Sequence, residues 1–198
     1  MKDSKLEILV VEDETIIRTS FVMMLEDMGH VVVGEAANGE LALQMIEERK
    51  PNMVLLDINL PEINGLKVLE YINEKYHIPC IIITGYYSEE FLDRAKKAGA
   101  FNYLIKPIDA LQLSAAIEVT WQRYLEYASS KREQQRLSNA LEERKLVERA
   151  KGILMNCNGL TEEQAMRSLQ KRSRDSNVKL ADVARSVIEA DRVMRGLK

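Results

Sequence analysis

Short apolar runs rich in valine, isoleucine and leucine alternate with longer amphipathic segments through the first half of the chain. Such runs are typical of buried parallel strands, and the segments between them have the spacing of helices that cover a sheet. We therefore predict an α/β domain over residues 1–120, built on a five-stranded, doubly wound parallel sheet. The predicted strands are 6–11, 30–36, 52–57, 79–84 and 100–105, and the predicted helices are about 14–28, 39–49, 64–75 and 88–98.

A long helix is predicted to follow this domain. Between Asp109 and Gly152 the chain contains no Pro, no Gly and no strand pattern, so nothing in that stretch ends a helix. We interpret residues 121–140 as a helical linker or coiled coil.

Apolar residues along this helix have the spacing of a coiled-coil seam. The steps of 4, 3 and 4 are interrupted by the polar stretch SSKREQQR and then resume. We expect part of the helix to form a dimer contact. The alternative is that these side chains pack the helix onto its own sheet, which suits Ile117 better than Tyr124 or Ala128. The apolar positions are Ile117, Trp121, Tyr124 and Ala128, then Leu137 and Leu141.

The last part of the chain, 141–198, is predicted to form a small three-helix domain. Asn158 and Gly159 end the first helix, and Thr161 with Gln164 has the pattern of a capping box that opens the second. The third helix spans about 180–195. The expected inward residues are Leu146, Ala150, Ile153 and Leu154, then Ala165, Met166 and Leu169, then Leu180, Val183, Ala184, Val187 and Ile188.

The composition is that of an ordinary globular protein, with 46% hydrophobic and 30% charged residues. Cys80 and Cys157 have neither a disulfide pattern nor metal-ligand spacing, which favours a reducing cytosol. The N-terminus meets acidic residues too early for a signal peptide, and no segment is apolar over the length that spans a bilayer. We therefore expect a cytoplasmic protein without a membrane partner.

Charge is distributed unevenly along the chain. Residues 1–130 contain 12 Lys and Arg against 21 Asp and Glu, whereas residues 131–198 contain 16 against 10. The first part thus carries −9 and the second +6. Because the two parts differ in sign, we expect them to meet different partners.

Polar residues stand at the carboxyl ends of four predicted strands, the edge where ligands bind in open α/β sheets. Three carboxylates, one hydroxyl and one ammonium at one edge are hard to assign to packing, although acidic residues at single loop ends are often only solvated. Crowded carboxylates repel one another unless a cation lies among them, and an all-oxygen cluster suits Mg²⁺. The residues are Glu12, Asp13, Asp57, Thr84 and Lys106.

This set of residues predicts a phosphoryl-transfer site. With its charge screened, Asp57 can attack a phosphoryl group while Lys106 stabilises the transferring oxygens. The resulting aspartyl phosphate has oxygens within reach of the Thr84 hydroxyl, which would report the new charge. Tyr86, two residues further on, is a candidate to alter the rate of hydrolysis in either direction.

The constellation resembles the receiver domain of two-component response regulators, a flavodoxin-like fold, and the match covers residues 5 to about 120. The resemblance implies that Asp13 binds Mg²⁺ directly, Glu12 through water and Asn59 through its backbone carbonyl. It also implies that Tyr103 turns inward after phosphorylation and that Lys106–Pro107 is a cis peptide. For Tyr103, half-buried packing on its strand is the alternative.

The basic tail resembles the ANTAR domain, an RNA-binding module of transcription antiterminators, over roughly 140–195. The resemblance lies in RKLVERAKGILMNCNGLTEEQA and in KLADVARSVI downstream. Met166 departs from the family where an aromatic is frequent, and Ser173–Arg174 where Ala–Met is frequent. No aromatic follows Tyr127, so arginine would have to stack on RNA bases.

Most of the cations considered for RNA contact cluster around the end of the second tail helix, and Lys151 and Lys179 are further candidates. For each alone, a solvated surface charge is the alternative. The candidates are Lys151, Arg167, Lys171, Arg172, Arg174 and Lys179.

Two hypotheses for function follow. In the first, a sensor histidine kinase phosphorylates Asp57, two chains pair through the long helix, and their tails bind RNA hairpins in a leader transcript to cause antitermination. In the second, the receiver controls a DNA-binding or protein-interaction module, because helix-turn-helix proteins can have a similar composition. In both, the chain accepts a phosphoryl group and slowly loses it again, and is not a turnover enzyme.

Overall fold

The computed structural model describes residues 5–196 apart from 86–92 and 96. The chain divides into two compact units, Met1–Ala128 and Ser129–Lys198. The predicted residue Tyr86 and most of the predicted helix 88–98 lie outside the described residues; within that helix, Asp93–Ala95 and Lys97 are helical.

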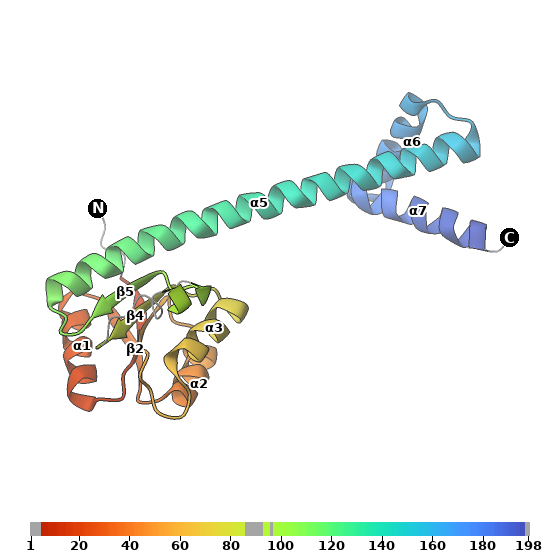
Figure 1. The fold of residues 1–198 in the computed structure, drawn as a ribbon. Coiled ribbons are helices and arrows are strands. Elements are labelled where there is room, and N and C mark those ends of the chain that lie inside the picture. The colour runs from red at the N-terminus through yellow and green to blue at the C-terminus, as the bar shows by residue number, and fades with distance from the viewer. Residues whose placement is uncertain (1–4, 86–92, 96, 197–198) are drawn as a thin grey trace. The chain divides into compact units, whose positions relative to one another are not determined.

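The first unit is a five-stranded parallel sheet of order β2-β1-β3-β4-β5 with helices on both faces (Figure 1). The five strands appear where the apolar runs predicted them. They are β1 (Glu7–Val11), β2 (Val31–Ala36), β3 (Met53–Asp57), β4 (Cys80–Thr84) and β5 (Asn102–Ile105). The helices are α1 (Thr15–Asp27), α2 (Gly39–Arg49), α3 (Gly65–Lys75) and the first part of α5 (Ala110–Asn158).

Alternate strand residues face opposite sides of the sheet and fill two hydrophobic cores. On one side, residues such as Leu9 and Leu56 pack with the apolar faces of α2 and α3. On the other, residues such as Ile8 and Leu55 pack with α1 and with Ile117 of α5. Both faces of the sheet are thus covered, as the doubly wound prediction requires.

The packing of α5 onto the first unit reaches further than its sequence suggests. Ile117 is buried and Trp121 packs against the same core. Tyr124 contacts both Trp121, at a ring-centroid distance of 5.4 Å, and Phe101, at 6.0 Å. The packing interpretation therefore applies to Tyr124 as well as to Ile117.

Helix α5 is continuous over 49 residues. The first predicted tail helix is its C-terminal part and ends, as predicted, at Asn158 before Gly159, whose φ is +64°. The polar stretch interrupts the apolar spacing without breaking the helix, because serine, lysine, arginine, glutamate and glutamine all tolerate a helix interior.

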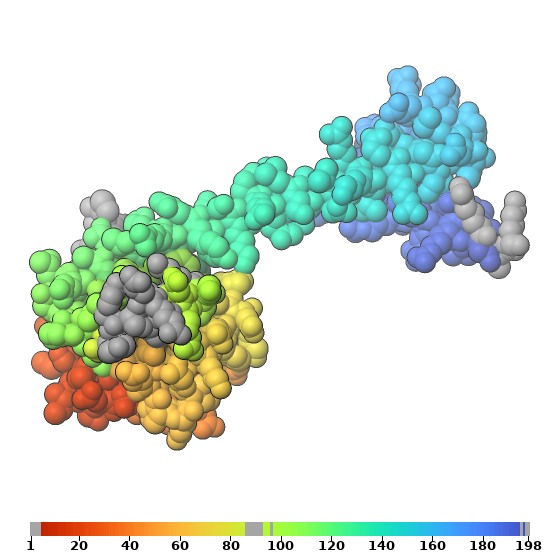
Figure 2. Space-filling view, in the orientation of Figure 1, coloured from red at the N-terminus to blue at the C-terminus, as the bar shows by residue number. Residues whose placement is uncertain are grey.

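The second unit closes around the C-terminal part of α5 with α6 (Glu162–Ser176) and α7 (Leu180–Gly196) (Figures 1 and 2). The predicted capping box is present: the Thr161 side chain accepts from the Gln164 backbone N–H, and the Gln164 side chain accepts from Thr161. Met166 is half-buried and lines a surface groove. The core consists of Ala150, Leu154, Ala165, Leu169, Ala184 and Val187, with Leu146, Ile153, Leu180, Val183 and Ile188 packed against it.

Candidate functional site

The predicted acidic residues meet at the carboxyl edge of the sheet. Glu12 and Asp13 follow β1, Asp57 ends β3, Thr84 ends β4 and Lys106 follows β5. The strands are parallel and in register, with Asp57 opposite Ile83 and Thr84 opposite Ile105, so their ends reach the same edge. Residues separated by up to 94 positions in sequence are thereby brought to one site.

Lys106 joins two of the carboxylates. Its Nζ lies 2.6 Å from Asp57 Oδ2 and 2.7 Å from Glu12 Oε2. The side chains of Glu12 and Asp57 are almost fully buried, Lys106 is partly exposed and Asp13 is exposed. A single ammonium therefore offsets two buried carboxylates, while Asp13 stands at the solvent side.

Burial raises the pKa of Glu12, and the nearby Asp57 carboxylate adds to this effect, while Lys106 opposes it. Burial lowers the pKa of the Lys106 ammonium, but its contacts with Asp57 and Glu12 outweigh that, so its pKa is raised overall. Lys106 is therefore fully charged at neutral pH, the form that an anionic phosphoryl group requires.

The carboxylates fit a divalent cation. One oxygen from each of Glu12, Asp13 and Asp57 lies within 4.8 Å of the others. Glu12 Oε2 is buried and lies 2.7 Å from the Lys106 ammonium, which is a single positive charge among three carboxylates. An all-oxygen donor set with excess negative charge is the kind that Mg²⁺ binds. Asn59 is exposed beside them, and its backbone N–H donates to Asp57 Oδ1 at 3.1 Å. The metal role of its carbonyl stays a prediction.

The two predicted switch residues differ in exposure. The Thr84 side chain is buried at the end of β4. The backbone of Thr84 lies next to that of Lys106, whose N–H donates to Thr84 O at 2.9 Å. Tyr103 on β5 is exposed, with 37% of its surface accessible, so its ring is not packed inward in this conformation. Its inward movement stays a prediction. The Lys106–Pro107 peptide is cis, as the resemblance implied.

Two residues that position the site were missed in the sequence. Arg18 of α1 donates to the backbone carbonyls of Glu12, at 2.7 Å, and Asp13, at 3.4 Å, and so holds the acidic turn. Gly65 lies where a Cβ would be 2.2 Å from Asp57 O, so no other residue fits without moving the backbone. The Asn64–Gly65 pair at the start of α3 could have indicated a close backbone approach in the sequence. A single arginine on α1 gave no such indication.

Family comparison decides the identity. The response regulator receiver domain model matches residues 8–118, and the ANTAR domain model matches residues 135–188. The chain belongs to the response regulators that carry an ANTAR domain. This combination supports an RNA-binding output.

Similar proteins support both parts. The transcriptional regulatory protein PdtaR of Mycobacterium tuberculosis (strain CDC 1551 / Oshkosh) is 36% identical over 182 residues, which cover 92% of this chain and 89% of the relative. A CheY-like response regulator receiver domain protein from Methanospirillum hungatei JF-1 matches with a TM-score of 0.58 and 31% identity, over 63% of this chain and 99% of that one. The signal receiver domain of a modulated diguanylate cyclase from Desulfovibrio desulfuricans G20 matches with a TM-score of 0.59 and 29% identity, over 63% and 99%. These solved structures correspond to the receiver domain.

The ANTAR domain does not present all predicted cations equally. The Lys151 side chain is only 10% exposed and its Nζ lies 2.9 Å from Glu148 and 2.8 Å from Glu162. Its prediction as an RNA contact therefore conflicts with the structure, because the ammonium is buried and paired between α5 and the start of α6. Arg167 is exposed but bridged to Glu163.

The other four candidates have a different environment. All are exposed, and none forms an ion pair within the described part of the chain: Lys171, Arg172, Arg174 and Lys179.

Among the described helices of either domain, none is long and apolar enough to cross a membrane.

Proposed function

We propose that a sensor histidine kinase phosphorylates Asp57, and that this modification pairs two chains whose ANTAR domains bind RNA hairpins and cause transcription antitermination. The observation that carries the proposal is the Asp57 carboxylate, buried at the sheet edge with Lys106 Nζ 2.6 Å away and two further carboxylates beside it. A phosphoacceptor site needs each of these groups: the Asp57 carboxylate as nucleophile, the Lys106 ammonium for the transferring oxygens, and the other carboxylates for a divalent cation.

In the proposed transfer, an oxygen of Asp57 forms a bond to phosphorus while the bond between phosphorus and the donor nitrogen breaks. Lys106 holds positive charge beside the transferring oxygens, and the backbone N–H of Asn59 fixes the other carboxylate oxygen. Glu12, Asp13 and Asp57 would hold Mg²⁺, which when bound neutralises charge on the carboxylates and the phosphoryl group.

The readout proposed for the product involves Thr84 and Tyr103. The Thr84 hydroxyl at the end of β4 donates to a phosphoryl oxygen, and Tyr103 moves from its partly exposed position into the space that this leaves. The same site later admits water, which hydrolyses the acyl phosphate. The chain is thus a phosphoacceptor that resets itself, without turnover of an external substrate.

The acceptor is tested with Asp57→Asn, labelled by acetyl phosphate in the presence of Mg²⁺. We expect loss of covalent phosphate from the full chain. The matched control is Asp109→Asn, which changes an exposed carboxylate outside the pocket and should label like the parent. Undiminished labelling of the Asp57 variant would place the acceptor elsewhere.

The output is tested by binding of the full chain to pools of hairpin RNA and of duplex DNA, with and without beryllofluoride and Mg²⁺. We expect a preference for RNA that increases with the phosphoryl mimic. A preference for DNA, or no nucleic-acid binding in either state, would favour the alternative of a DNA-binding or protein-interaction module under receiver control.

A further inference from the structure

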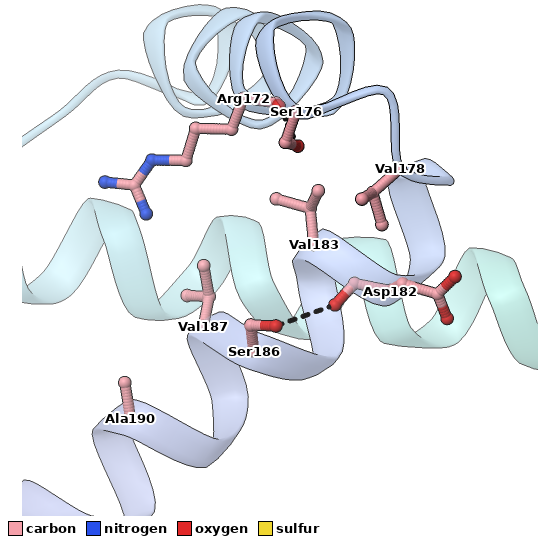
Figure 3. Close-up of a pocket in the computed structure, with 8 residues that line it drawn as sticks. All are labelled: Arg172, Ser176, Val178, Asp182, Val183, Ser186, Val187 and Ala190. Carbon is pink, nitrogen blue, oxygen red and sulfur yellow. Dashed lines mark hydrogen bonds between the residues drawn. The ribbon is translucent and has the colours of Figure 1, made fainter.

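A groove of 320 Å³ lies between α6 and α7 of the ANTAR domain (Figure 3). It opens where the C-terminal part of α6 crosses above the first turns of α7. The lining residues come from these two helices and the turn between them: Arg172, Ser176, Val178, Asp182, Val183, Ser186, Val187 and Ala190.

The floor of the groove is aliphatic. Val183, Val187 and Ala190 follow one another along one side of α7 below Arg172, and Val178 closes one end (Figure 3). Val178 remains 42% exposed. A floor of this kind accepts the face of a flat apolar ring, and exposing it to water is unfavourable.

The Arg172 guanidinium lies above this floor and has no side-chain partner among the described residues. The side chain extends from α6 above Val187 (Figure 3), and it has no ion pair or side-chain hydrogen bond within the described residues. By contrast, Arg167 is bridged to Glu163, and Arg185 lies 2.7 Å from Asp182 Oδ1. The one arginine over the groove is therefore available to a ligand.

The groove also presents hydrogen-bond acceptors. Ser186 Oγ donates to the backbone carbonyl of Asp182 at 3.1 Å, and Ser176 Oγ donates to that of Arg172 at 2.6 Å. Because both hydroxyl protons are donated to the backbone, these serine oxygens can only accept a hydrogen bond from a ligand in the groove. The Asp182 carboxylate is paired with Arg185 and points away from Arg172 (Figure 3).

We propose that this groove binds one unpaired nucleobase of the RNA. The base stacks between the Arg172 guanidinium plane and the aliphatic side chains of Val183 and Val187, and its amino edge donates to the serine oxygens. Stacking on an arginine plane is a general way of holding a splayed base, and this basic domain has no aromatic to do it. The inference rests on the proposed RNA-binding function and deepens it.

Charge complementarity favours RNA over an apolar peptide as the occupant. An unpaired guanidinium above the groove would be desolvated without compensation by an apolar side chain. A nucleotide instead supplies a π face for the guanidinium and a phosphate for the exposed cations outside the groove, Lys171 and Arg174.

The probe is a stem-loop RNA selected by the full wild-type chain from a pool with a randomised loop, in the presence of beryllofluoride and Mg²⁺. Each loop position is replaced in turn by an abasic nucleotide. We expect one position at which the abasic change weakens binding about tenfold. Arg172→Lys keeps the charge but loses the plane, so it should weaken the intact RNA about tenfold and abolish that abasic penalty, with an unchanged salt dependence.

One matched pair and one further variant separate the groove from its surroundings. Ala190→Leu fills the groove at an exposed position, whereas Gln170→Leu adds the same side chain on α6 outside it; only the first should weaken binding. Lys171→Ala should reduce the salt slope by about one and keep the abasic penalty. Circular dichroism checks that each variant is folded.

The outcomes distinguish the inference from the function on which it rests. If the wild-type chain binds the loop RNA and Arg172→Lys and Ala190→Leu leave both affinity and abasic penalty intact, the nucleobase site is refuted and the RNA-binding function stands. If the wild-type chain binds no RNA, both fall. If the two variants instead change self-association in sedimentation at unaltered RNA affinity, the groove is a protein contact and the inference is wrong.

Discussion

Lys106 is the residue on which the charge balance of the receiver pocket depends. Its ammonium lies within 2.7 Å of both Glu12 and Asp57, and neither carboxylate has another cation within the described residues at ion-pair distance. Burial, and to a lesser extent the Asp57 carboxylate, raise the pKa of Glu12, and Lys106 opposes both effects. Without Lys106 this pKa would rise further.

Replacing Lys106 with Met should slow phosphorylation by acetyl phosphate by about 100-fold, because one preorganised charge that stabilises the transferring oxygens is lost. Single-turnover labelling of the full chain at saturating Mg²⁺ measures this rate. Lys67→Met removes an exposed lysine of α3 and is the matched control. Equal rates for the two variants would exclude Lys106 from the transfer.

The pocket residues could be predicted from the sequence because their positions follow from one rule. Each stands at the carboxyl end of a recognisable strand or just after it, and parallel strands end at one edge. Lys151 had no such rule. Its partner Glu162 is brought close only by the turn after Asn158, so its burial depends on helix packing that periodicity does not specify. A single sequence does not show whether a given lysine will be exposed or buried.

At the scale of elements, apolar spacing predicted each described strand and helix of the sheet domain to within about two residues at either end, β5 being the shortest relative to its prediction. Residues 100 and 101 precede this strand, and the Phe101 ring meets Tyr124 and Tyr127 of α5 edge-on. The spacing of Tyr124 alone could not distinguish this contact from a coiled-coil seam, since both place an apolar side chain on the same helix face.

The stabilisation that the Lys151–Glu162 ion pair gives to the packing of α6 on α5 should depend on pH. The Lys151 hydrogen bond and charge lower the pKa of Glu162 below its ordinary 4.5. A carboxyl with a lowered folded-state pKa stabilises the fold above its unfolded value and loses that effect as pH falls through the folded value. Lys151, with a raised pKa, stays charged throughout this range. Glu162→Gln should therefore speed amide hydrogen exchange of α6 several-fold at pH 7, and this effect should shrink as the pH falls below 4.5 and through the folded-state pKa.

The ratio of variant to wild-type exchange in the full chain is the quantity to compare at each pH. Glu163→Gln is the control, because within the described residues Glu163 is bridged to the exposed Arg167 on the same helix and such surface pairs contribute little. A ratio for Glu162→Gln that stays constant from pH 7 to pH 3 would contradict the assigned pair.

At the scale of the whole molecule, one helix connects an acidic receiver domain to a basic ANTAR domain. Helix α5 contributes Ile117 to the core of the first and Ala150 to the core of the second. No Gly or Pro interrupts it before Gly152. If Asp57 is the phosphoacceptor, as proposed, α5 is the segment of chain through which a change in the receiver core would reach the ANTAR core.

The dimer proposed for the phosphorylated state should require the exposed apolar residues of α5. Leu137 and Leu141 are 62% and 54% exposed and share one helix face at a spacing of four, so charging them leaves both cores intact. Leu137→Glu with Leu141→Glu should keep labelling at Asp57 but abolish the increase in mass that beryllofluoride and Mg²⁺ cause in sedimentation equilibrium. Gln135→Glu with Asn139→Glu adds the same charge away from that face and should still dimerise. If the leucine variant dimerises normally, α5 pairs through another face; if both the variant and the wild type remain monomers with the mimic, phosphorylation acts within one chain.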